Sequence, residues 1–204
     1  MNTLKRNYPW LLLFGSLIGL NETLVGSLQI PYHSVVLSTI TLLLLTLARA
    51  SFPQKGTSLV IIAIALVFKL SHMGIRECTA PALLCGPAAM AMLGAGYELF
   101  ASQFTRDRQF SYANGILSCS LTSLVTFGLF GLLQGNVLHI WDPARMQNYI
   151  FARGPLTALA SSVAGTAGIA FLQAVKNTGL PTLHPWLTRG LLFAIVLSLW
   201  VIGR

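Results

Sequence analysis

Charge is scarce in this chain. Charged residues make up 9% of the 204 residues, and hydrophobic residues make up 54%. An ordinary soluble domain carries roughly 25% charged residues, so this composition could not cover a surface exposed to water. The scarcity of charge excludes an ordinary soluble protein. It predicts a polytopic membrane protein with a single integral membrane domain, residues 1–204.

Negative charge is the scarcer kind, with five Asp and Glu residues against thirteen Lys and Arg residues. The net charge of +8 does not indicate binding to nucleic acid, because the basic residues are scattered between apolar runs. Such scatter is what the positive-inside rule expects of a membrane protein. We therefore expect a lipid bilayer among the partners of the chain, and no nucleic acid.

Signatures of catalysis and of metal binding are missing as well. The chain has no Gly-rich phosphate loop, no GxSxG and no HExxH sequence. Its three cysteines form no CxxC pair and so predict neither a disulfide framework nor a metal site. A bis-histidine haem would need His33 and His72 to face each other, and no haem-attachment motif accompanies them. We expect no catalytic residue, no metal and no cofactor, and we predict that the protein is not an enzyme.

Long apolar runs dominate the chain. A membrane helix needs about 20 mostly apolar residues, and turn or charge signals separate seven candidate runs. These runs are residues 9–28, 33–50, 57–74, 79–102, 111–134, 155–175 and 187–203. The sequence therefore predicts an all-α bundle with seven transmembrane helices. Six is the alternative, because the last run is short and has Arg189 at its start.

Lys and Arg residues in the loops favour a cytoplasmic N-terminus. With that orientation, the longest break between the apolar runs lies outside. This break, residues 139–154, is too polar to span a membrane and carries Trp141, Tyr149 and Phe151. Aromatic rings of this kind favour the membrane surface. We expect an outer interfacial segment, either a loop or a short helix that covers an outer cavity.

Isolated polar residues interrupt the apolar runs. A polar or charged side chain at membrane depth is costly, and it usually faces protein or water at a functional site. In the predicted orientation most of these residues gather in the outer half, whereas Glu98 lies toward the cytoplasm. We therefore expect an outer solute-binding site. Its candidate residues are Asn21, Glu22, His33, Lys69, His72, Gln134 and Asn136.

Lys69 leaves three interpretations open. It shares one helix face with His72 and Arg76, because residues three and four apart lie on the same side of a helix. Its ammonium group could reach the outer headgroups, pair with Glu22, or contact an anionic ligand. The last two interpretations are compatible with each other.

Small residues mark close helix packing in the first run. Gly15 and Gly19 form a GxxxG pair, and such faces let helix backbones approach closely in a membrane. The pair predicts either packing inside the bundle or docking of a separate membrane partner.

One stretch carries a family resemblance. In "PYHSVVLSTITLLLLTLARASFPQKGTSLVIIAIALVFKLS" an apolar helix ends in a basic residue, a P-x-x-G hairpin follows, and the next helix closes in K-L-S. This pattern resembles the substrate-binding S components of energy-coupling factor (ECF) vitamin transporters. The resemblance covers roughly residues 9–135.

The resemblance implies a six-helix core in the bacterial cytoplasmic (inner) membrane, with the substrate site on the outer side. It also implies that Gly15 and Gly19 contact a coupling membrane subunit and that ABC ATPases supply the energy. The expected function is therefore capture of a small vitamin-like or anionic solute for an ECF-type importer. The alternative is a structural or assembly subunit of a larger membrane complex.

Overall fold

The computed structural model describes residues 2–27, 31–73, 80–104, 110–177 and 193–200 of the chain. Within these ranges every regular element is a helix, which agrees with the predicted all-α class. The first four long helices are α1 (Asn2–Ser27), α2 (His33–Ser51), α3 (Thr57–Met73) and α4 (Ala80–Phe104). They begin and end near the limits of the predicted apolar runs.

The second half of the bundle consists of two long helical rods. The first rod is α5 (Tyr112–Leu132), which continues into a π-helical turn, η1 (Leu133–Val137). The second rod begins with α6 (Pro143–Asn148), passes through the π-helical turn η2 (Tyr149–Arg153), and continues as α7 (Gly154–Asn177). A further helical segment covers residues 193–200.

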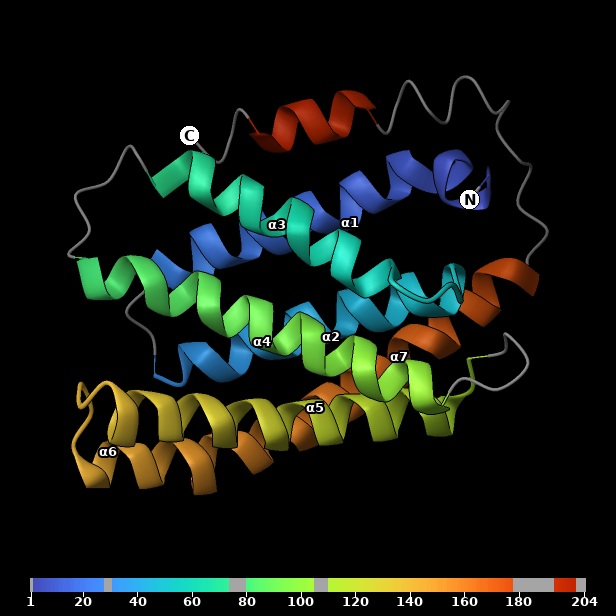
Figure 1. Ribbon diagram of the computed structural model, residues 1–204. Coiled ribbons are helices and arrows are strands. Elements are labelled where there is room, and N and C mark those ends of the chain that lie inside the picture. Colours follow the sequence, from blue (N-terminus) through green and yellow to red (C-terminus); the bar gives the residue numbers. More distant parts are fainter. Residues whose placement is uncertain (1, 28–30, 74–79, 105–109, 178–192, 201–204) are drawn as a thin grey trace.

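Six helices form a closed ring in the order α1, α2, α7, α5, α4 and α3, with each helix packed against the next (Figure 1). Successive long helices of the chain run in opposite directions, whereas the ring neighbours α1 and α3, and likewise α2 and α7, are parallel. The bundle therefore has two ends. The Glu22 end, on the left in Figure 1, holds the last turns of α1 and α3, the first turns of α2 and α4, and η1. The Glu98 end holds the α2–α3 turn and the last turns of α4.

Local sequence signals explain where several helices begin. Ser111 precedes α5, and its hydroxyl accepts the backbone N–H of Asn114 at 3.3 Å. Asp142 precedes α6, and its carboxylate accepts the backbone N–H of Arg145 at 2.9 Å. Both side chains satisfy a donor that the first helical turn leaves free. Gly56 takes a φ of 85° in the turn before α3, a conformation that glycine adopts without strain.

The pair of glycines in α1 lies inside the bundle. A Cβ atom added at Gly15 would lie 2.6 Å from Cβ of Ile64, and one added at Gly19 would lie 2.7 Å from Cβ of Phe68. Both neighbours belong to α3, so the small face of α1 is covered by a helix of the same chain. This placement agrees with the internal-packing interpretation rather than with an open docking face.

Four of the described helical stretches are long and apolar enough to cross a membrane: Tyr8–Gly26, His33–Ser51, Tyr112–Val137 and Pro143–Val175. Thr57–Ser71 is apolar but shorter. These stretches support a membrane protein with transmembrane helices. The count of six or seven spans stays a prediction, and much of the seventh run, residues 187–203, lies outside the described residues.

The expected interfacial segment, residues 139–154, is not a separate element at the surface. Its first part belongs to the turn between η1 and α6, and from Pro143 onward it is helical. This helical part, α6 with η2, packs against the α5–η1 rod and leads directly into α7 (Figure 1). The segment is therefore the first part of a long helix, and it includes the short helix that the sequence allowed.

Candidate functional site

Lys69 and Glu22 form an ion pair at the Glu22 end. The Lys69 Nζ atom lies 2.6 Å from the Glu22 Oε1 atom, and both side chains are mostly buried, with 15% and 12% of their surfaces exposed. Gly86 of α4 lies directly beside this pair, because a Cβ atom added there would lie 2.6 Å from Lys69 Nζ. The structure shows the pairing with Glu22, which is compatible with the interpretation that Lys69 contacts a ligand. The pairing neutralises two charges that the apolar surroundings would otherwise penalise.

The other candidates near this pair have separate surroundings. Asn21 is buried, and its side-chain amide donates to the backbone carbonyl of Leu37 at 3.2 Å, which ties α1 to α2. His33 is exposed at the first turn of α2. The backbone of His72 belongs to α3, but its side chain lies outside what the structure describes.

Gln134 and Asn136 lie in η1, on the opposite flank of the same end. Gln134 is buried, and its backbone carbonyl accepts the N–H groups of Ile140 and Trp141 at 2.9 Å and 3.3 Å. These bonds fold the chain back after the π-helical turn. Asn136 is exposed and borders a pocket of about 360 Å³.

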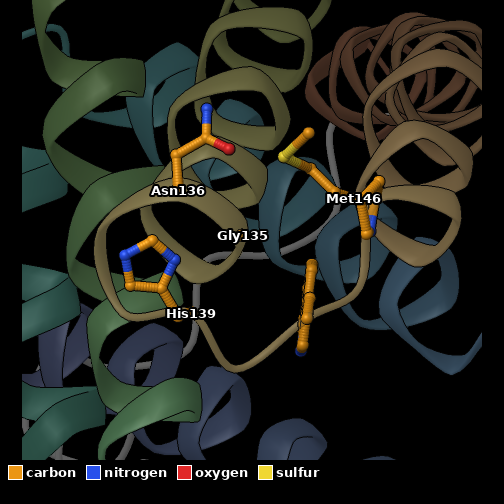
Figure 2. A pocket seen from close by; sticks show the side chains of 6 residues that line it. Gly135, Asn136, His139 and Met146 are labelled. Atoms are coloured by element: carbon orange, nitrogen blue, oxygen red, sulfur yellow. The ribbon is translucent and has the colours of Figure 1, made fainter.

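The pocket lies between η1 and the start of α6. Figure 2 shows Asn136 and His139 on one side of it and Met146 on the other. The remaining lining residues are Gly135, Trp141 and Pro143. The side chain of Met146 packs against the backbone of Gly135, where a Cβ atom would collide with its sulfur atom. Glycine at this position therefore lets α6 approach η1 closely beside the pocket.

Aromatic rings hold one wall of the pocket. The Trp141 ring meets Phe130 edge-on at a centroid distance of 5.8 Å and Tyr149 at 4.8 Å. Tyr149 also stacks on Phe127 at 4.6 Å, with an interplanar angle of 15°. Such contacts each stabilise a packed site. The Trp141 side chain is therefore positioned by the protein without help from a ligand.

Arg153 connects this flank with the start of α2. Its Nη1 atom donates to the Ser34 hydroxyl at 3.3 Å, and its Nε atom donates to the Asn148 side chain at 3.4 Å. Its guanidinium also lies 5.5 Å from the centroid of the Tyr32 ring, within the range of a cation–π contact. The side chain fixes the position of η2 relative to α2.

The predicted site residues thus fall into two groups rather than one. Asn21, Glu22 and Lys69 lie between α1 and its neighbours, whereas Gln134 and Asn136 lie on the α5–η1 rod (Figure 1). These five residues lie on elements of the Glu22 end, and an outer solute-binding site formed by them stays a prediction. The pocket borders Asn136 but neither Glu22 nor Lys69.

A second ion pair, at the other end, was not predicted. Arg49 Nη1 lies 3.3 Å from Glu98 Oε1, with 1% and 10% of the two side chains exposed. The Glu98 carboxylate also accepts the backbone N–H groups of Gly56 at 2.7 Å and Ser58 at 3.1 Å. A carboxylate is favourable at the start of a helix such as α3. The sequence signal was present in Glu98, an isolated acid in an apolar run, but nothing in the sequence indicated Arg49 as its partner.

Sequence analysis also left Gly135, His139, Trp141 and Met146 out of the site. His139 and Trp141 were assigned only to the interfacial segment. Gln134 and Asn136 come directly before that segment in the sequence. Residues at the start of the segment therefore had to lie near them, and this was the available signal. The π-helical geometry of η1, which decides this return, leaves no mark in the apolar pattern.

The middle of the bundle contains a buried polar chain. The Tyr97 hydroxyl donates to the Thr46 hydroxyl at 3.0 Å, and Thr46 Oγ1 lies 3.2 Å from the Cys119 sulfur. These contacts join α4, α2 and α5 and satisfy polar atoms in a fully buried place. Within the described ranges, His, Cys, Asp and Glu form no cluster of three that could hold a metal ion.

Comparison of the chain with protein-family models, with curated proteins and with solved structures found no match.

Proposed function

We propose that the chain is a membrane-embedded solute-capture subunit with a role like that of the S components of ECF-type importers. Its solute is small and vitamin-like or anionic. The proposal places the chain in a bacterial cytoplasmic (inner) membrane, with the N-terminus in the cytoplasm and the Glu22 end outside. A coupling membrane subunit and ABC ATPases would supply the energy, because the chain has no nucleotide-binding motif.

The observation that carries the proposal is the pocket between η1 and α6. It has about 360 Å³, within the range of small-molecule sites. Aromatic packing positions its wall, and the polar side chains of Asn136 and His139 border it. A preformed pocket with a few polar groups is a common feature of ligand-binding sites.

Lys69 and Glu22 have a supporting part in this proposal. Their ion pair holds α1, α3 and α4 together at the same end as the pocket. Gly15 and Gly19 are packing residues in this structure. A coupling role for them would require α3 to move away from α1, and the proposal does not depend on it.

The alternative, an assembly subunit of a larger membrane complex, also has an observation in its favour. Asn21, Glu22 and Lys69 are all engaged in contacts within the chain. A protein that only packs would use its buried polar residues in this way.

Gentle purification of the full-length tagged chain from its host membranes would test the proposal. Mass spectrometry of the copurified material should find two ABC-type ATPases, a coupling membrane subunit and a small molecule. The small molecule should be lost in Gly135→Leu, which fills the pocket. It should be retained in Gly128→Leu, whose added Cβ has no atom within 4 Å. Other membrane subunits, with no ATPase and no small molecule, would overturn the proposal in favour of assembly.

A further inference from the structure

The pocket is lined without any charged side chain. None of its six lining residues is Asp, Glu, Lys or Arg. The acid nearest in sequence, Asp142, caps α6 by accepting the Arg145 backbone N–H at 2.9 Å. An organic cation would therefore find no carboxylate on the pocket lining to neutralise it.

A defined positive charge lies at the Trp141 ring. The Arg145 guanidinium carbon lies 5.0 Å from the centroid of the Trp141 ring, in the geometry of a cation–π contact. The Arg145 guanidinium thus occupies a position at the Trp141 ring that a cationic ligand could otherwise take. It also makes the electrostatic potential beside the pocket more positive. The surroundings therefore favour an uncharged or anionic ligand over a cationic one.

Two polar side chains on one side of the pocket are available for hydrogen bonds. Neither the Asn136 amide nor the His139 imidazole bonds to any residue in the described part of the chain. An amide both donates and accepts, and a neutral imidazole also carries one donor and one acceptor. A ligand edge with adjacent donor and acceptor atoms would satisfy both groups.

The backbone holds His139 in an uncommon conformation. Its φ is 53°, in the left-handed region that residues other than glycine seldom occupy. The bonds from Ile140 and Trp141 to the Gln134 carbonyl keep the turn in this shape. The fold thus maintains a strained residue on the side of the pocket where Asn136 lies, and such strain is concentrated at binding sites.

We infer that the pocket binds a small planar ring, uncharged or anionic, which packs against Trp141 and directs its polar edge to Asn136 and His139. The inference depends on the proposed capture function and names the class of its solute. The volume of about 360 Å³ admits a compact ring compound rather than a long chain. Trp141 supplies a flat apolar surface that favours an aromatic ring.

A matched set of probes separates the features of the inference. Benzamide is a planar neutral ring with an amide edge, benzoate is its anionic counterpart, and phenyltrimethylammonium is cationic. Cyclohexanecarboxamide has the same amide on a ring that is not flat. Binding to the full-length chain in lipid nanodiscs would be measured by saturation-transfer NMR, with empty nanodiscs as the background.

Benzamide and benzoate should bind, and cyclohexanecarboxamide should bind about tenfold more weakly because it loses the aromatic contact. Phenyltrimethylammonium should give no signal above the nanodisc background. Gly135→Leu should abolish binding, and Gly128→Leu should leave it intact. Equal binding of the flat and the saturated amide, or preference for the cation, would overturn the inference.

Asn136 gives a test that does not disturb the packing, because its side chain is exposed. Asn136→Ala should weaken benzamide binding by about tenfold through the lost pair of hydrogen bonds. Asn136→Asp should weaken benzoate binding further and allow phenyltrimethylammonium to bind. Unchanged probe preferences in both variants would contradict the assigned role of Asn136.

The two proposals fail in different ways. If the wild-type chain retains a non-aromatic solute that Gly135→Leu loses, the solute class is wrong and the capture function stands. If no probe binds and no solute is retained by wild type or variant, the capture function fails and the inference fails with it.

Discussion

Glu98 has three partners at one end of the bundle, whereas Glu22 has one ion-pair partner at the other. The Glu98 carboxylate binds the Arg49 guanidinium and two backbone N–H groups at the start of α3. Among the residues that the structure describes, the Glu22 carboxylate pairs with the Lys69 ammonium alone, and Gly86 lies directly beside this pair. Each acid lies in a helix that is otherwise apolar.

The junction at the Glu98 end is therefore closed, whereas the junction at the Glu22 end can adapt. At the Glu98 end, Arg49 also donates to the Gln54 carbonyl, and Thr57 donates to the same carbonyl at 2.8 Å. The α2–α3 turn thus supplies acceptors to Arg49 and Thr57 and donors to Glu98. The Glu22 end has a flexible lysine in its ion pair and an open pocket on its other flank. The proposed entry of a solute at the Glu22 end agrees with this asymmetry.

The largest effect should come from breaking the closed junction. Glu98→Ala would leave Arg49 buried without its counter-charge and two α3 N–H groups without an acceptor. We expect the free energy of unfolding to fall by about 3–5 kcal/mol, measured in bicelles by steric trapping. Glu98→Gln, which keeps an acceptor for the N–H groups, should lose less. A loss below about 1 kcal/mol for the alanine variant would contradict a structural role for this junction.

A smaller effect is expected at the other end. Lys69→Ala leaves a single mostly buried carboxylate, and the free energy of unfolding should fall by about 1–3 kcal/mol. The double variant Lys69→Ala with Glu22→Gln should recover part of this loss, because no lone charge remains. If the single variant costs as much as Glu98→Ala in the same assay, the two ends do not differ in the way described.

The smallest effect should come from adding a methyl group beside the Lys69–Glu22 pair. Gly86→Ala places a Cβ atom 2.6 Å from Lys69 Nζ, the far end of a flexible side chain that can shift. We expect a change below about 1 kcal/mol, since alanine also favours the helix. Gly94→Ala in the same helix is the contrasting control. Its Cβ would collide with the Ile62 side chain and should cost about 1–3 kcal/mol. A larger loss for Gly86→Ala than for Gly94→Ala would show that the ion pair is rigid.

The helices of the first half could be predicted from the sequence. The apolar runs and the turn at Pro53–Gly56 determine α2 and α3 because buried helices need such runs and a break between them. Pairing of Glu22 with Lys69 was among the open interpretations, since a charge in apolar surroundings requires a partner. The pairing itself could be shown only by the relative positions of α1 and α3.

The features that could not be predicted from the sequence depend on contacts between residues far apart in the chain. Arg49 and Glu98 are 49 residues apart in sequence, and nothing in either segment indicates that α4 passes beside the α2–α3 turn. The pocket depends on η1, where one turn widens within a rod that is apolar on both sides. The buried face of α5 is rich in Gly, Ser, Thr and Cys and its exposed face carries Ile, Leu and Val, but this pattern does not indicate where a turn becomes π-helical.

The two π-helical turns have a consequence for how the chain tolerates changes in length. A π turn holds one residue more than an α turn, so η1 and η2 each behave as a helix with one residue inserted. A helix absorbs the extra residue in such a turn without turning the residues that follow. Removal of one residue from η1 would restore an ordinary helical turn and shorten the stretch that carries Gly135 and Asn136 past Met146. The shape of the proposed pocket therefore depends on a single residue of η1.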